Sequence, residues 1–268
     1  MSGFGFTPAD QAALAEALRI IQNPSLAIRL ANTVGLPIER LIANLPGRWS
    51  EAVTRAASRA IERALETAVS TLDTTRAGAP ANMLHKVACG ASGGLGGFFG
   101  VSALVVELPV STTLMLRSIA DIARGAGEDI RSLETRLACL EVFALGGLNA
   151  GENGADAGYY AVRGALAAAV REAAEYLAEK GMASSGAPVL VRLISQVASR
   201  FGTAVSEKVA AQAVPVLGAV GGAAVNLVFI EHFQNMARAH FTIRRLERRY
   251  GPDKVRAALE SMARSDNG

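Results

Sequence analysis

Two long stretches of the sequence carry no charged side chain and are rich in glycine and alanine. Residues 87–106 read VACGASGGLGGFFGVSALVV, and residues 209–230 read VAAQAVPVLGAVGGAAVNLVFI. Each is long enough to cross the hydrocarbon core of a bilayer, which is about 30 Å thick. Glycines four residues apart, such as Gly218 and Gly222, let two helices approach closely. The stretches therefore predict either buried helices in a soluble core, or helices that dock on, insert into or span a membrane.

The rest of the chain has the composition of a folded, helical protein. Half of its residues are apolar, which excludes intrinsic disorder, and no run alternates polar and apolar side chains as a half-buried strand does. Capping residues, prolines and glycines predict helices over residues 8–23, 48–72, 110–124, 132–145 and 159–180, one from Pro188, one ending at Tyr250 and a short one from Pro252. We expect Pro109 to interrupt the chain before the helix at 110, and Pro215 to break or kink the second apolar stretch.

These patterns predict a single all-α domain of many helices, with two glycine-rich apolar helices at its centre and no β-sheet. We divide the chain into an N-terminal helical region (1–80), a helical core (81–251) and a short C-terminal helix with its tail (252–268). The first residues, MSGFGFTPADQ, lack the pattern of a signal peptide. Because the only cysteines, Cys89 and Cys139, lie among apolar residues, we expect a reducing, cytoplasmic location.

Motifs that would identify a cofactor or a metal ion are missing from the sequence. There is no CxxC, HExxH or DxDxDG pattern of metal ligands. The glycine run ASGGLGGFFG lacks the lysine of a phosphate-binding loop, and no GxSxG motif indicates a nucleophile. We therefore expect neither a metal nor a cofactor.

Positive charge is concentrated near the end of the chain. The segment from Glu231 to Arg256 has seven basic and three acidic residues, a net charge of +4, whereas the whole chain has +3. Its helix HFTIRRLERRYG carries a basic band made by Arg244, Arg245, Arg248 and Arg249. Such a band predicts binding to anionic lipid head groups, and the alternative is a solvated face with internal salt bridges. Nucleic acid is not an expected partner, because the overall charge is low and no reading motif is present.

Several polar side chains lie within otherwise apolar helices, where they must be paired or hydrogen-bonded. The candidates for catalysis are Glu107, Asp121, Glu141 and His240. Arg117 and Asp121 are four residues apart and are positioned to pair, and with Asn226 they predict a structural polar network. The two hypotheses are a network that fixes the register of the helices and a carboxylate/histidine site that acts as acid and base. The second requires the four candidate side chains to converge.

Several blocks of the sequence resemble the EcsC family. They include ELPVSTTLMLRSIADIARGAGEDI, ETRLACLEVFALGG, GYYAVRGALA and the segment from APVLVRLISQVASRFG to FTIRRLERRYG, and together they cover about residues 81–251. The resemblance implies a bacterial protein of unsettled biochemistry, from a family named after a gene beside an ABC transporter linked to secretion and membrane-protein processing. Some relatives carry a peptidase label. The family pattern often has Asp where this chain has Glu107, so the resemblance implies that an acid matters there, but it transfers no catalytic residue.

Taken together, these features predict a cytoplasmic protein that associates reversibly with the inner membrane. Partial exposure of residues 87–106 and 209–230 would provide the apolar contact, and the four arginines would bind anionic lipid. One alternative is a hydrolase with a buried carboxylate/histidine site. Another is an adaptor for a membrane transporter or a membrane protease.

Overall fold

The computed structural model describes residues 5–22, 25–43, 48–70, 101–147, 155–181, 187–213 and 218–266. These residues form an all-α domain, and no strand occurs among them. The helices are α1 (Pro8–Gln22), α2 (Leu26–Val34), α3 (Ile38–Ala43), α4 (Arg48–Ser70), α6 (Val101–Gly125), α7 (Leu133–Leu145), α8 (Ala155–Lys180), α9 (Pro188–Gln212), α10 (Gly218–Tyr250) and α11 (Pro252–Asp266). The predicted fold class is confirmed.

Most helix ends follow from local sequence signals. α4 begins at the predicted residue and buries its apolar stripe, including Val53, Ala57 and Ile61, at 3% exposure or less. α9 begins with Pro188, whose fixed φ and missing N–H suit the first turn of a helix. α10 ends before Gly251, which adopts a φ of +91° that is easily reached only without a Cβ.

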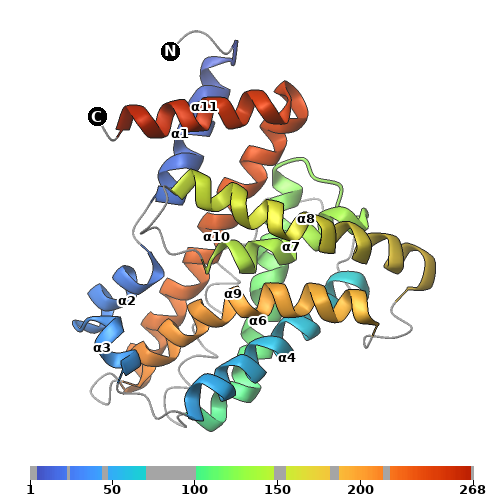
Figure 1. Ribbon diagram of the computed structural model, residues 1–268. Helices are drawn as coiled ribbons and strands as arrows, with labels where there is room; N and C mark the ends of the chain where they lie inside the picture. The colour runs from blue at the N-terminus through green and yellow to red at the C-terminus, as the bar shows by residue number, and fades with distance from the viewer. Residues whose placement is uncertain are drawn as a thin grey trace.

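α7 and α10 form the centre of the molecule. Ten of the thirteen residues of α7 are buried, and α10 packs against helices from both halves of the chain, among them α1, α6 and α9. Four phenylalanines join α7, α9 and α10, with ring centroids between 5.0 and 6.2 Å apart: Phe143, Phe201, Phe229 and Phe233. α4 and α9 pack together at one end of the molecule, and α1 and α11 lie at the other (Figure 1).

The two apolar stretches do not appear as two continuous helices in the described chain. Residues 71–100, which hold most of the first stretch, lie outside the described residues, and its last six residues open α6. The second stretch is divided between the end of α9 and the start of α10. Among its described residues, Val209, Val225 and Phe229 are at most 4% exposed, whereas Leu227 is 41% exposed. Within the ranges that the structure describes, no helix has both the length and the apolar character needed to span a membrane.

Two predicted boundaries were wrong. α6 continues through Pro109 instead of beginning after it. The hydroxyls of Ser111 and Thr113 donate to the carbonyls of Leu108 and Pro109 at 3.1 and 2.9 Å, and α4 and α10 pack on the helix. A proline inside a helix removes one backbone donor and crowds the carbonyl four residues earlier, and here tertiary packing offsets that cost and keeps the helix intact. α8 begins at Ala155, four residues before the predicted start.

Candidate functional site

Asp10, in the first turn of α1, binds two arginines of α10. Its Oδ1 lies 3.3 Å from Nη1 of Arg245, and its Oδ2 lies 3.0 Å from Nη1 of Arg249. The hydroxyls of Tyr250 and Thr7 also donate to Oδ2, at 2.7 and 2.8 Å. The pKa of Asp10 lies below its usual value, mainly because of the hydrogen bonds from Tyr250 and Thr7 and then because of the two arginines.

Glu128, in the connection between α6 and α7, holds the other two arginines. Nε of Arg244 lies 3.2 Å from Oε1 of Glu128, and Nη1 of Arg248 contacts the same oxygen. Arg244 also lies 3.3 Å from Oε1 of Glu134. Two carboxylates that are only 5% exposed therefore hold four guanidinium groups.

We call these four side chains the arginine face: Arg244, Arg245, Arg248 and Arg249. The side chains of Arg245, Arg248 and Arg249 are 38%, 46% and 56% exposed, and that of Arg244 is 17% exposed. Aromatic rings lie beside this face. The rings of Phe6 and Tyr250 pack edge to face at 4.6 Å, and Nζ of Lys254 lies 5.7 Å from each ring centre.

Glu141 and His240, predicted as acid–base candidates, lie together between α7 and α10. Oε2 of Glu141 is 3.7 Å from Nε2 of His240, which is longer than a hydrogen bond. The other ring nitrogen of His240, Nδ1, lies 3.1 Å from the hydroxyl of Tyr159 on α8. Arg163 donates to the same hydroxyl at 3.4 Å. If Tyr159 accepts from Arg163 and donates to Nδ1, the ring proton of His240 lies on Nε2 and faces Glu141.

Burial sets the protonation of this pair. The pKa of Glu141 is raised to about 7, because the low-dielectric interior disfavours its charge more than the nearby Arg163 and Arg244 favour it. Burial also lowers the pKa of His240 well below its usual value, and Arg163 and Arg244 add to this effect. Near neutral pH, His240 is therefore uncharged and Glu141 exchanges a proton readily, as a general acid or base must.

A cavity of about 600 Å³ opens beside Glu141. Its basic lining consists of Arg163, Arg171, Arg244 and Arg256. Arg163 forms two hydrogen bonds with the carboxylate of Glu247, at 2.8 and 2.9 Å, which hold its guanidinium in place. Tyr160 also lines the cavity. The cavity thus combines a proton-exchanging carboxyl with fixed positive charge.

Glu107 belongs to a different site. Both of its carboxylate oxygens accept hydrogen bonds from Nζ of Lys208, at 2.9 and 3.0 Å, and Oε1 also accepts one from Asn226 at 3.3 Å. Lys208 is completely buried. Because Asn226 and His240 are fourteen residues apart on α10, the two sites are separated by about 21 Å along the helix axis. The structure does not bring Glu107 to Glu141.

Asp121 is paired with an arginine of its own helix. Its Oδ1 forms a salt bridge with Nη1 of Arg124 at 2.8 Å, one turn further along α6. Arg117 is exposed on the same helix. The structure brings Glu141 and His240 to 3.7 Å of each other and pairs Glu107 with Lys208 elsewhere, so the four candidate side chains do not all converge. Among the residues that the structure describes, no three His, Cys, Asp or Glu side chains gather as metal ligands do.

The sequence as a whole matches one family of proteins. The match is to the EcsC protein family, and it covers residues 13–246, which is most of the chain. The chain belongs to the EcsC protein family. No curated protein and no solved structure matches it.

In this EcsC protein the family match begins at residue 13, well before the sequence blocks that first suggested the resemblance. The match therefore includes α2, α3 and α4 and most of α1. The sequence analysis did not predict the residues that pair with the candidate side chains. Asp10 is recognisable in the sequence only as an acid in the first turn of a helix, and Lys208 only as the last charged residue before an uncharged stretch. No local pattern pairs residues that are 101 positions apart, as Lys208 and Glu107 are.

Proposed function

We propose that this EcsC protein docks reversibly on anionic lipid through the arginine face. The observation that carries the proposal is the sharing of Asp10 and Glu128 by four arginines. Two buried carboxylates cannot neutralise four guanidinium groups, so two positive charges are left over, or one when the exposed Glu134 is counted. The carboxylates fix the arginines in place while leaving three of them partly exposed, as an anion-binding surface requires.

The aromatic residues beside the arginine face support a membrane surface as the partner. Phe6 and Tyr250 lie next to Arg249 and Lys254, and Tyr250 has both an apolar ring and a polar hydroxyl. Aromatic rings with this character favour the boundary between head groups and acyl chains. The cytoplasmic leaflet of the inner membrane is the anionic surface that this proposal assigns to the protein.

The proposal does not use the apolar stretch at residues 209–230. Its described residues are largely buried in the core, where Phe229 packs against Phe201 and Phe233. Binding therefore rests on electrostatic attraction and on shallow insertion of a few aromatic side chains. This predicts a weak and salt-sensitive association.

The experiment compares flotation with vesicles of phosphatidylglycerol and of phosphatidylcholine. In the variant Arg248→Gln/Arg249→Gln, Glu128 keeps Arg244 and Asp10 keeps Arg245, so neither carboxylate is left without an arginine. Each basic residue near an anionic surface contributes about 1 kcal/mol, so the double variant should bind about 30-fold more weakly. The wild type should float with phosphatidylglycerol only.

The matched control is Arg55→Gln/Arg63→Gln on α4. These arginines are 63% and 68% exposed, and each is paired with a glutamate on the same helix, so the control removes the same charge from another face. It should bind like the wild type. Equal binding by the wild type and Arg248→Gln/Arg249→Gln, with both proteins folded by circular dichroism, overturns the proposal.

The contact between Glu141 and His240 favours a second candidate function, a hydrolase acting on an anionic substrate. Glu141 would take a proton from water, and Arg163, which lines the same cavity, would bind the negative charge of the substrate. His240 and Tyr159 would orient the carboxyl from its buried side.

This candidate is tested with chromogenic phosphate and carboxylate esters. Hydrolysis should rise with pH through about 7, as Glu141 ionises, and Glu141→Gln should lower kcat by a factor of at least about 100. Glu51→Gln removes an exposed carboxylate from α4, outside this cavity, and should leave kcat unchanged. Hydrolysis that is absent, or is equal in the wild type and Glu141→Gln, rejects this function.

A further inference from the structure

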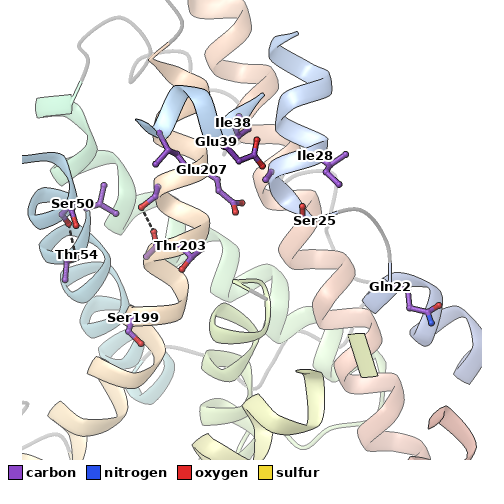
Figure 2. Close-up of a pocket in the computed structure, with 16 residues that line it drawn as sticks. Gln22, Ser25, Ile28, Ile38, Glu39, Ser50, Thr54, Ser199, Thr203 and Glu207 are labelled. Atoms are coloured by element: carbon purple, nitrogen blue, oxygen red, sulfur yellow. Dashed lines mark hydrogen bonds between the residues drawn. The ribbon is translucent and has the colours of Figure 1, made fainter. Parts of the chain in front are cut away.

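A second cavity, of about 820 Å³, lies at the other end of the molecule from the arginine face. It is formed where α2, α3, α4 and α9 meet (Figure 2). Two carboxylates line it, Glu39 from α3 and Glu207 from α9, and Figure 2 shows the two side chains close to each other. Neither the arginine face nor the Glu141–His240 pair contributes to this cavity.

Glu207 is buried here without a partner. The residue is 6% exposed and, within the described part of the chain, forms no hydrogen bond and no salt bridge. A buried carboxylate normally has a compensating donor or cation, because removing its charge from water is costly. Burial raises the pKa of Glu207 to about 7, and the charge of Glu39 adds to this effect. The uncompensated carboxylate lines a cavity large enough for a small organic molecule.

Three hydroxyls of the lining can accept hydrogen bonds from a ligand. The hydroxyls of Thr54, Ser199 and Ser206 already donate to the backbone carbonyls of Ser50, Gln196 and Gly202, at 2.8, 3.1 and 2.9 Å. Their lone pairs remain available to a ligand. No lysine, arginine or histidine is present among the described residues that line the cavity. A ligand with positive charge complements the two carboxylates of this lining, and the three hydroxyls can accept hydrogen bonds from it.

The remaining lining is apolar. Ile38 and Val53 are buried within it, and Ile28 and Ile42 are 50% and 38% exposed. An aliphatic chain would cover this surface, at about 25 cal/mol for each Å² removed from water. The two carboxylates and the apolar surface together favour an amphipathic cation as the ligand.

We propose that this cavity binds a small primary amine on an aliphatic chain, with its ammonium group between Glu207 and Glu39 and its chain along Ile28, Ile38 and Ile42. The ammonium group supplies three hydrogen-bond donors and a positive charge, which would compensate the two carboxylates. This inference is independent of docking on lipid and of the Glu141–His240 pair, because it uses different helices and the opposite sign of charge.

The experiment is a calorimetric titration of the full chain with n-hexylamine at pH 8, where Glu207 is ionised. The wild type should bind n-hexylamine at millimolar concentrations, and n-hexanol, which has the same chain without charge, should bind at least tenfold more weakly. Glu207→Gln keeps the shape of the side chain and should weaken n-hexylamine binding at least tenfold. Glu39→Gln should weaken it by a smaller factor, because Glu39 is exposed.

The matched control is Glu179→Gln, which removes an exposed carboxylate from the end of α8 and should bind as the wild type does. Absence of binding at millimolar n-hexylamine overturns the proposal. Equal affinity of the wild type and Glu207→Gln also overturns it, as does equal affinity for n-hexylamine and n-hexanol. Loss of lipid flotation does not bear on it, so this proposal and the docking proposal fail separately.

Discussion

At the scale of single residues, Glu207 shows that a buried side chain is not always a stabilising one. Its pKa is about 7 in the folded protein and near 4.5 in an unfolded chain. The folded state therefore holds a proton that the unfolded state has lost, and the contribution of Glu207 to stability falls as the pH rises from 4.5 through 7. Gln at this position carries no such penalty.

We therefore expect the free energy of unfolding of Glu207→Gln, relative to the wild type, to increase by about 2 kcal/mol between about pH 5 and pH 8. Urea unfolding of both proteins at several pH values measures this difference. The buried His232 and His240 have lowered pKa values and give the opposite pH dependence, but both proteins share them, so their effect cancels. A difference that is constant with pH would show that Glu207 is solvated or paired.

Sequence reasoning at this scale identified polar residues but not their partners. Glu141 and His240 stood out because each lies among apolar neighbours, and the structure brings them to 3.7 Å. The hydrogen bonds that link His240 to Tyr159, and Tyr159 to Arg163, could not be predicted, because they depend on how α8 packs between α7 and α11. The same limit applies to Lys208, whose partner comes from α6.

At the scale of elements, proline and glycine residues predicted the ends of helices correctly, except where tertiary packing carries a helix past a proline. The ends of α7 and α10 followed from Gly146 and Gly251, but Pro109 did not end α6. The glycine pair after α7 also has a packing role that sequence did not show. A Cβ on Gly147 would overlap the backbone carbonyl of Arg200 on α9, and one on Gly146 would overlap the ring of Phe233.

We expect Gly147→Ala to lower the free energy of unfolding by about 3 kcal/mol, because a backbone carbonyl cannot move aside as a flexible side chain can. Gly164→Ala is the matched variant. Gly164 lies inside α8, and a Cβ added there would meet nothing within 4 Å, so alanine should raise stability by about 0.5–1 kcal/mol. Urea unfolding monitored by circular dichroism measures both. Equal effects of the two substitutions would contradict the close contact between α7 and α9.

At the scale of the whole molecule, the two proposed binding surfaces differ in charge and position. The arginine face lies where α1, α10 and α11 meet, and the Glu207 cavity lies among α2, α3, α4 and α9 (Figures 1 and 2). The all-helical class was predictable from composition and periodicity. The division of the second apolar stretch between two helices was foreseen in part from Pro215, but the burial of its residues depends on long-range packing.

The position of the arginine face at one end of the molecule predicts how the protein is oriented on a membrane. A polarity-sensitive fluorophore attached through Lys254→Cys, beside the arginine face, should shift to the blue on phosphatidylglycerol vesicles and be quenched by lipid-borne quenchers. The same fluorophore at Arg59→Cys, exposed on α4, should not change. Cys89 is replaced by Ala in both proteins, and Cys139 is buried, with a raised pKa that keeps it unreactive.

The blue shift at position 254 should disappear at about 0.5 M salt, where the Debye length falls to about 4 Å and exposed charges are screened. Binding that depended on insertion of apolar helices would persist at this ionic strength, because burial of apolar surface is not weakened by screening. A signal that survives high salt, or that appears equally at positions 59 and 254, would assign membrane contact to a surface other than the arginine face. Electrostatic docking requires a blue shift at position 254 that high salt abolishes, and no blue shift at position 59 at either ionic strength.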